Sequence, residues 1–555
     1  MHSAPVPHRP GPPIGPDTPV GPRLPWDDVS IPALPESRSA VPTTGRPGNH
    51  RKPTEVAGRT PGWVPWPVLA VPVALVTLLV TWVGVGRQMW IDDYVTAYVT
   101  RLSWDDFTRL LGNQDLVHAL YYVVMRLWTA VFGTSLLMLR LPSMIGMAVA
   151  AGAVTVLGRR LHSTPVGLTA GLVFAALPAV SRFGLEARSY AWVVALAVLS
   201  TLALTAALDR PTTPRWLLYA LLMVTLTYLH FAAAMVLVPH GLMAWYAWRC
   251  REAGRFGWWM AMAAIVAVAA APLLYFASRQ SGQVSWVKAD WAGVRQYPGQ
   301  LFTSETVFWA IALIGVVGAA RLAQTRPGLA SPLLAWALVP PLLSYATNGF
   351  AHLFLAKYAL FTLPAWALLA ASALVSPGTD ADRAFSIPQP ASIPRVSGVL
   401  AGLLVLSLAG LGGQREARRS PLSYEPDFRA AAGVVDAQAQ PGDGVAYVGT
   451  YRWARLPFAY ELHRARPVDV FAEVPPAQNG WFYPRECADP ARCLGNTRRV
   501  WLVVTNYTGD DYYGLPEKQA ELLRRQYHVT NTSKFENVRV LLLVRNAERP
   551  DRPAR

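Results

Sequence analysis

Long apolar runs constrain this chain more than any other feature. A helix needs about 20 apolar residues to cross the hydrocarbon core of a bilayer. Lipid offers no hydrogen-bond partners to the backbone, and a chain with many such runs must therefore fold as a bundle of helices. Charged residues make up only 15% of the sequence, against about a quarter in soluble proteins. Runs of suitable length fall at about 66–86, 141–158, 164–180, 189–208, 216–232, 233–248, 258–277, 305–320, 329–349, 354–375 and 396–412.

Basic residues between these runs predict the orientation of the chain. Arg159, Arg160 and Arg249 lie at alternate turns, and such residues concentrate on the cytoplasmic side of membrane proteins. With eleven crossings, this rule places the N-terminus inside and the C-terminus outside. A shorter run, 117–133, contains Arg126; we expect it to be a re-entrant or interfacial helix, and twelve crossings are the alternative. The net charge of +16 is thus explained by topology, and the predicted partners include membrane lipids and no nucleic acid.

Composition divides the chain into three parts. Residues 1–62 are rich in Pro, Gly and Arg and lack periodicity, which predicts a disordered cytoplasmic tail. No cleavable signal is visible, and the first apolar run is expected to remain as an anchor in the plasma membrane. Residues 63–413 form the predicted multi-span domain, with an external loop at 87–140. Residues 414–555 alternate helix-like and strand-like segments, which predicts a small extracytoplasmic α/β domain with a mainly parallel sheet.

The three cysteines suggest where the chain meets an oxidising compartment. Cys487 and Cys493 lie six residues apart in the polar segment PRECADPARCLG. Zinc sites normally use tighter spacing and a second ligand pair, which this segment lacks. A small disulfide loop in an oxidising exterior is the preferred interpretation. Cys250 stands in the basic segment WRCREAGR and is expected to be a reduced cytoplasmic thiol.

Two adjacent carboxylates, Asp92 and Asp93, follow the first apolar run and open an amphipathic, aromatic-rich stretch. Ionisable residues at a membrane face are costly to place and are usually solvated or functional. Two interpretations stay open on the residues alone: a helix N-cap, which Asp favours, or a site that takes a proton from a hydroxyl group. Asp105 and Asp106 follow Ser103 and are expected to cap a helix. The same external segment contains Asp115, His118, Tyr121 and Tyr122.

Further polar side chains lie at the ends of later apolar runs. Glu186, Arg188 and Tyr190 occur in RFGLEARSYAW at an external boundary. A loop or helix start would aim them inward, and a surface ion pair with an interfacial tyrosine is the alternative. His230 ends an apolar run, either as a functional group or as a neutral histidine bonded between helices. Lys357, in FAHLFLAKYALFTLP, either binds phosphate or extends to the membrane interface.

The order of these features resembles that of membrane glycosyltransferases that use a polyprenyl-phosphate sugar. These include protein O-mannosyltransferases (glycosyltransferase family 39), the lipid A aminoarabinose transferase and actinobacterial mannosyltransferase-like proteins. Asp92-Asp93 takes the place of the family's Asp-Glu pair in the first external loop. The chain departs from the family's pattern in having Asp93 for Glu and Lys357 for Arg. Over about 65–450 the similar segments occur in the family's order: NQDLVHALYYVVMRLW, FGTSLLMLRLPS, GLEARSYA, YLH, AKYALFTLP and EPDFRAAA.

The resemblance implies a fold and a reaction. The fold is that of a C-type glycosyltransferase, an α-helical polytopic membrane protein of about 11–12 spans with an external cavity and a small α/β C-terminal domain. The reaction is an inverting transfer of mannose, or of another hexose or pentose, from a polyprenyl-phosphate donor to a glycan, lipid or protein hydroxyl outside the membrane. The alternatives are a lipid or glycan transporter, whose two halves should match, and a non-catalytic envelope scaffold. We find no matching halves.

The resemblance also implies roles for individual residues. Asp92 is expected to be the general base, and Asp93 to support it or to help bind the acceptor. Lys357, Arg188 and His118 are expected to stabilise the leaving phosphate, whose charge grows in the transition state. No metal or other cofactor is predicted to be required, and a divalent metal stays an open alternative. The expected substrate-binding residues are Asp115, His118, Tyr121, Tyr122, Glu186, Arg188, Tyr190, His230, Lys357 and Tyr358.

Overall fold

Apolar helices build most of the molecule, as the runs in the sequence predict. The computed structural model describes residues 66–250, 254–375, 393–448, 454–505 and 509–547; the tail predicted at 1–62 lies outside them. Within the described residues, eight helical segments are long and apolar enough to cross a membrane. They are α5 (Leu136–Leu161), α8 (Tyr190–Asp209), η2 with α10 (Phe231–Cys250), α11 (Gly254–Ser278), α13 (Glu305–Thr325), α14 (Pro327–Ala346), η4 with α16 (Ala356–Leu374) and α17 (Ile393–Arg418).

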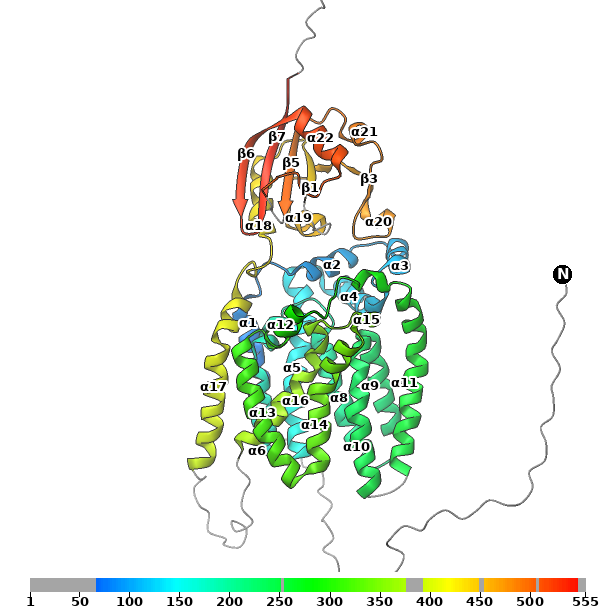
Figure 1. Ribbon diagram of the computed structural model, residues 1–555, viewed down its shortest axis with the longest axis vertical. Coiled ribbons are helices and arrows are strands. Elements are labelled where there is room, and N and C mark those ends of the chain that lie inside the picture. The colour runs from blue at the N-terminus through cyan, green and yellow to red at the C-terminus, as the bar shows by residue number, and fades with distance from the viewer. Residues whose placement is uncertain (1–65, 251–253, 376–392, 449–453, 506–508, 548–555) are drawn as a thin grey trace, which may run out of the picture. The chain divides into compact units, whose positions relative to one another are not determined.

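Shorter helices complete this bundle (Figure 1). The central helix α5 packs against α8 and against two of the shorter helices, α1 and α6, while α9 packs against α8 and α11. Small residues allow such close approach: a Cβ atom at Gly158 of α5 would lie 2.8 Å from the Cα of Gly167 in α6. Eight of the described segments are long and apolar enough to cross a membrane. The count of eleven crossings therefore stays a prediction. The shorter helices are α1 (Trp66–Gly84), α6 (Thr164–Ala176) and α9 (Thr213–Leu229).

The run at 117–133 does not pass through the bundle. It forms η1 (Leu116–His118) and α4 (Ala119–Phe132), which lie at one end beside α2 (Ile91–Val99) and α3 (Trp104–Asn113) (Figure 1). Arg126 in α4 donates to the carbonyl of Val99 in α2 at 2.8 Å. Arg140, near the start of α5, donates to the carbonyl of Val85, just after α1, at 2.5 Å. Helix α4 therefore lies at the end of the bundle where α1 ends and α5 begins, and its re-entrant or interfacial character stays a prediction.

The same end of the bundle, called the site end below, collects the segments that follow α7, α9 and α14. Helix α3 begins there with Ser103 as its N-cap, whose hydroxyl accepts from the amide of Asp106 at 3.1 Å. The expectation that Asp105 and Asp106 cap the helix is therefore wrong, because Ser103 is the N-cap and both aspartates lie in the first turn. Short helices close this end of the bundle: α7 (Pro178–Phe183), η3 (Ser281–Val284), α12 (Trp291–Phe302) and α15 (Asn348–Ala351).

The last part of the described chain is a small α/β domain around a five-stranded sheet of order β2-β1-β5-β7-β6. Strand β1 pairs in parallel with β2 and β5, whereas β7 pairs antiparallel with β5 and β6. The sheet is therefore mixed, and the expectation of a mainly parallel sheet is wrong. An apolar pattern predicts a strand but not the direction of its partner. The strands are β1 (Gly444–Val448), β2 (Val468–Asp469), β5 (Arg499–Thr505), β6 (Tyr527–Phe535) and β7 (Val538–Arg545).

Helices cover both faces of this sheet (Figure 1). Along β5, Trp501 and Val503 pack with α18 and α19, while Val500 and Leu502 pack on the other face with α22. This alternation is the period of two expected of a strand buried on both sides. A disulfide joins Cys487 to Cys493 in the segment before β5, and Cys250 is an exposed free thiol. The remaining elements are α18 (Phe428–Gln438), α19 (Arg455–Glu461), β3 (Ala472–Val474), α20 (Pro476–Asn479), β4 (Arg485–Glu486), α21 (Pro490–Leu494) and α22 (Glu517–Gln526).

The α/β domain is hydrogen-bonded to the site end of the bundle. Tyr94 of α2 donates to Glu461 of α19 at 2.6 Å, and Asn113 of α3 donates to the carbonyl of Gly480 at 3.0 Å. Gln88, in the segment before α2, donates to the carbonyl of Pro426 at 2.9 Å. The predicted domain boundary at 413/414 falls inside α17, so this helix leads directly into the domain that covers the site end.

Candidate active site

Asp92 and Asp93 occupy the first turn of α2 but face different surroundings. Asp93 is fully buried, and its two oxygens accept from the backbone amides of Trp90, at 3.2 Å, and Ala187, at 2.7 Å. Thr96 donates to the carbonyl of Ala187 at 2.8 Å. Asp93 therefore closes the start of α2 and ties it to the loop between α7 and α8. This is the capping role that the sequence left open for the pair.

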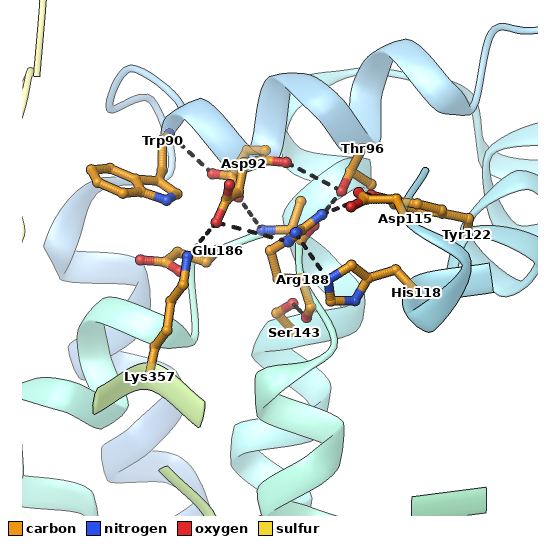
Figure 2. A network of polar contacts seen from close by, with 12 residues as sticks. Trp90, Asp92, Thr96, Asp115, His118, Tyr122, Ser143, Glu186, Arg188 and Lys357 are labelled. Carbon is orange, nitrogen blue, oxygen red and sulfur yellow. Dashed lines mark hydrogen bonds and ion pairs between the residues drawn. The ribbon is translucent and has the colours of Figure 1, made fainter. Parts of the chain in front are cut away.

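Asp92 faces two cations instead (Figure 2). Its Oδ2 lies 2.6 Å from Nζ of Lys357 and 4.0 Å from Nε of Arg188. The three residues come from α2, η4 and the loop before α8, so the fold brings together segments far apart in the chain. Burial acts to raise the pKa of Asp92, but Lys357 and Arg188 outweigh it and hold that pKa below its ordinary range. Asp92 is therefore an ionised carboxylate in this arrangement.

Arg188 is held in place by a chain of polar side chains (Figure 2). Its Nη1 donates to the hydroxyl of Tyr122 at 2.9 Å, and that hydroxyl donates to Oδ2 of Asp115 at 2.6 Å. Its Nη2 lies 3.3 Å from Nε2 of His118. Since a guanidinium can only donate, His118 accepts through Nε2 and carries its proton on Nδ1. Burial, followed by Arg188, lowers the pKa of His118 well below its ordinary value, so this histidine is neutral.

Side chains from another segment hold the backbone around Asp115 in place. Asp115 adopts a left-handed conformation with φ of 59°, which is uncommon for a residue other than glycine. Gln283 donates to the carbonyl of Asn113 at 3.0 Å and accepts from the amide of Asp115 at 3.3 Å. Gln280 accepts from the amide of Leu116 at 3.0 Å. These two glutamines, which follow α11, stabilise the turn that places Asp115 against Tyr122.

Glu186 is a buried carboxylate whose oxygens make no hydrogen bond among the described residues. It is 1% exposed, and Nε of Arg182 lies 3.4 Å from its Oε1. Burial raises the pKa of Glu186, and burial together with the charge of Glu186 raises the pKa of Asp93. Buried acceptors normally find donors, so the lack of a hydrogen bond to Glu186 among the described residues is unusual.

Aromatic rings line the space around Lys357. Its Nζ lies 5.8 Å from the ring centre of Tyr190, close enough for a cation–π contact. The ring centre of His230 lies 4.7 Å from that of Tyr358 and 6.0 Å from that of Tyr190. Tyr121 packs beside Tyr122, at 6.3 Å between ring centres. Every predicted catalytic or substrate-binding residue is thus at the site end.

Sequence reasoning missed three arginines that balance the acidic residues. Arg140 is fully buried and Arg87 is 4% exposed, and both lower the pKa of Asp93 against the effect of burial. Arg182 donates to the hydroxyl of Tyr424 at 2.5 Å as well as facing Glu186. One feature of the sequence could have indicated them: Arg140 lies inside an apolar segment, where a buried charge requires a partner of opposite charge or a hydrogen bond.

The arrangement suits chemistry on an anionic substrate. Lys357 and Arg188 offer adjacent cations, Asp92 offers a carboxylate between them, and Glu186 offers acceptors that make no hydrogen bond among the described residues. In the part of the chain that the structure describes, no three His, Cys, Asp or Glu residues are grouped as metal ligands. These residues can hold a phosphate beside a carboxylate that takes a proton.

Comparison with known proteins identifies the fold. The sequence model of the dolichyl-phosphate-mannose-protein mannosyltransferase family matches residues 119–276, which contain His230 and the whole loop between α7 and α8. The solved structure of ArnT from Cupriavidus metallidurans bound to undecaprenyl phosphate covers 86% of this chain and 97% of ArnT, with 13% identity and a TM-score of 0.50. The chain has the fold of a C-type membrane glycosyltransferase. This confirms the fold that the resemblance implied.

Two further solved structures resemble the chain. The apo structure of the same ArnT gives 15% identity over the same shares of the two chains, with a TM-score of 0.50. AglB, an archaeal oligosaccharyltransferase from Archaeoglobus fulgidus in complex with an inhibitory peptide and a dolichol-phosphate, is 11% identical. That match covers 79% of this chain and 69% of AglB with a TM-score of 0.45. No curated protein sequence matches the chain. In the C-type fold of this chain, the cluster around Asp92 lies where the bundle meets the α/β domain.

Proposed function

We propose that this chain is a multi-pass plasma-membrane glycosyltransferase that uses a polyprenyl-phosphate sugar and acts on an extracytoplasmic hydroxyl group. The observation that carries the proposal is the cluster of Asp92, Lys357 and Arg188. A carboxylate can take the proton of an acceptor hydroxyl, and two fixed cations can bind the departing phosphate. The similarity to ArnT, whose structure contains undecaprenyl phosphate, supports a lipid-linked donor. The sugar is mannose or another hexose or pentose.

The proposed step is a direct displacement at the anomeric carbon. The acceptor oxygen attacks this carbon from the face opposite the phosphate, and the new carbon–oxygen bond forms as the bond to the phosphate oxygen breaks. The configuration is thereby inverted. Asp92 takes the hydroxyl proton, and the electron pair of the broken bond leaves with the polyprenyl monophosphate. Lys357 and Arg188 stabilise the charge that develops on this leaving group.

The ion pair between Asp92 and Lys357 has to open before this step. An ammonium 2.6 Å from the carboxylate lowers its basicity and occupies the position that an acceptor hydroxyl needs. A donor phosphate competes with Asp92 for the same two cations. Donor binding therefore releases Asp92 toward the acceptor while Lys357 and Arg188 turn to the phosphate.

The other residues support this arrangement in distinct ways. Tyr122 and neutral His118 orient the guanidinium of Arg188. Asp93 positions the loop that carries Arg188, through its bond to Ala187. Glu186 offers carboxylate oxygens that make no hydrogen bond among the described residues and that fit hydroxyl groups of a sugar. In this proposal His118 acts on the phosphate through Arg188.

Replacing Asp92 by Asn tests the proposal. Removal of a general base typically costs about 10²–10⁴-fold in rate, so transfer of labelled sugar from a polyprenyl-phosphate donor should fall by at least about a hundredfold. Folding and membrane localisation should persist. Asp105→Asn is a matched control, because Asp105 is an exposed carboxylate in the first turn of α3.

Full transfer activity with both Asp92 and Asp93 neutralised would overturn the proposed mechanism. Mass spectrometry of envelope glycans, lipids and proteins from a strain lacking the chain should reveal one lost sugar and its acceptor. An unchanged envelope, combined with altered movement of the lipid-linked donor between leaflets, would favour a transporter instead.

A further inference from the structure

A cavity lies at the end of the bundle away from Asp92. It has a volume of about 360 Å³ and forms where α5, α8 and α10 end and α14 begins. Its walls combine apolar side chains with two arginines. Its lining includes Arg160, Leu208, Asp209, Met243, Ala247 and Arg326.

Three features of this cavity favour an anion at its rim. Arg160 and Arg326 both line it, and Arg160 is partly neutralised by Asp209 at 2.7 Å. Arg326 also donates to the carbonyl of Leu161 at 3.0 Å, which holds it at the rim. Helix α14 starts here without a side-chain cap, and the start of a 20-residue helix carries a partial positive charge. Gly328, in its first turn, lines the cavity without a side chain to cover the backbone.

The apolar wall distinguishes this cavity from a simple phosphate site. Leu208, Met243 and Ala247 belong to the lining, and Leu208 is 6% exposed. The short segments at this end of the bundle are also rich in arginine, which predicts contact with the anionic cytoplasmic leaflet. A ligand that matches the whole lining needs a phosphate and an adjoining hydrocarbon part.

We propose that the cavity binds one anionic glycerophospholipid. Its phosphate lies at the start of α14 between Arg160 and Arg326, and the first part of an acyl chain covers Leu208 and Met243. Asp209 stays paired with Arg160, so one net positive charge remains for the phosphate. The proposal rests on this cavity alone and does not depend on the transferase activity proposed above.

Native mass spectrometry of the purified full-length protein tests the site, with phosphatidylglycerol or phosphatidylcholine added to the detergent. The wild-type protein should retain one phosphatidylglycerol and little phosphatidylcholine. The double variant Arg160→Gln with Arg326→Gln should bind phosphatidylglycerol at least about tenfold more weakly, because each lost charged hydrogen bond has an effect of about this size. The matched control, Arg210→Gln with Arg249→Gln, removes the same charge from the same end outside the lining and should stay within about twofold.

If the control variant lost as much phosphatidylglycerol binding as the double variant, the lipid would be held by the overall positive charge of this end, and the proposal would be overturned. Equal retention of phosphatidylglycerol and phosphatidylcholine by the wild-type protein would overturn it too. Displacement of phosphatidylglycerol by millimolar inorganic phosphate would point to a small anion and would also overturn it. A second variant guards against misfolding of the double mutant. Ala247→Trp fills the cavity and keeps both arginines, and it should abolish phosphatidylglycerol retention while thermal stability and membrane insertion are preserved.

Discussion

Asp92 and Asp93 are adjacent in α2, yet their side chains have different partners because they point in different directions from the helix. Asp93 uses both oxygens for backbone amides, at 3.2 and 2.7 Å, whereas Oδ2 of Asp92 faces two cations, at 2.6 and 4.0 Å. Successive residues of a helix point in directions about 100° apart. The pair therefore divides into one carboxylate that builds the site and one that is available to react.

Asp93→Asn should behave as a structural variant. An amide offers one acceptor and a donor group, so one of the amides of Trp90 and Ala187 would lose its partner. A buried unsatisfied group costs about 1–3 kcal/mol, and thermal unfolding of the purified protein should shift down accordingly. Because Asp93 positions the loop that carries Arg188 through Ala187, the donor KM of the folded fraction should rise as well. An unchanged unfolding temperature together with a loss of turnover as large as that of Asp92→Asn would give Asp93 a direct chemical role.

Lys357→Met should change both donor affinity and pH dependence. Loss of a charged hydrogen bond to the phosphate costs about 1.5–3 kcal/mol, so the donor KM should rise at least about tenfold. Lys357 lowers the pKa of Asp92, and its removal therefore raises that pKa. The acid limb of kcat/KM should consequently move to higher pH, which a pH–rate profile measures.

Lys357→Arg is the matched comparison for that variant. It keeps the positive charge, so the acid limb should stay near its wild-type position while the donor KM changes by less than in Lys357→Met. Arginine spreads its charge over a planar fork, and the distance to Asp92 will differ. Identical pH profiles for the Met and Arg variants would show that Lys357 does not control the basicity of Asp92.

At the scale of elements, the site depends on loops that other elements hold in place. The loop before α8 is tied to α2 by the carboxylate of Asp93 and the hydroxyl of Thr96. The turn at Asp115 is tied to the segment after α11 by Gln280 and Gln283. Catalytic side chains require such support because small displacements of a positioned group reduce rate steeply.

Gln283→Ala tests this support without touching a residue that meets the substrate. It removes two bonds to the turn at 113–115, so Asp115 should orient Tyr122 and Arg188 less well. We expect kcat/KM to fall by about five- to tenfold, a loss equivalent to about one weakened hydrogen bond. Steady-state kinetics checks this. Gln296→Ala, an exposed glutamine on α12, is the control, and an equal loss in both variants would contradict the positioning role.

The sequence predicted which elements meet at the site, but it did not predict how each side chain is used there or every strand of the α/β domain. The apolar runs and the alternating arginines placed Asp92, Arg188 and Lys357 at one end, and the structure brings them into contact. The different fates of Asp92 and Asp93 depend on where the loop before α8 docks, which no local pattern records. Strand β6 was not anticipated, because this edge strand is polar and largely exposed and lacks the apolar alternation of a buried strand.

At the scale of the whole molecule, the α/β domain completes the surroundings of α2. Arg429 donates to Glu461 at 3.1 Å and to the carbonyl of Gly86 at 2.8 Å, and Glu461 accepts from Tyr94 of α2. Trp90 packs edge to face on Tyr424 at 5.2 Å. The linker between α17 and α18 thus lies against the acidic first turn of α2. A negative charge in this linker is therefore expected to weaken the contact between the α/β domain and α2.

Glu425 makes this contact sensitive to pH. Burial raises the pKa of Glu425 to about 8, and the backbone amide of Ile91 opposes this rise while the charges of Asp93, Asp92 and Glu186 add to it. The pKa in the unfolded chain is the ordinary 4.5, so the folded protein binds more protons between these values. Stability from neutral Glu425 is therefore complete below about pH 4.5 and is lost as the pH rises toward 8.

Glu425→Gln should remove this dependence, because the amide keeps the shape of the neutral acid and does not ionise. Thermal unfolding of the purified protein at pH 6 and pH 9 gives the measurement. The wild-type protein should lose more stability over this interval than the variant, and the variant should be the more stable of the two at pH 9. Glu536→Gln, an exposed acid that pairs with Arg419 in the same region, is the control and should keep the wild-type slope. If Glu425→Gln and the wild type lose stability in parallel up to pH 9, ionisation of Glu425 does not weaken the contact between the α/β domain and α2.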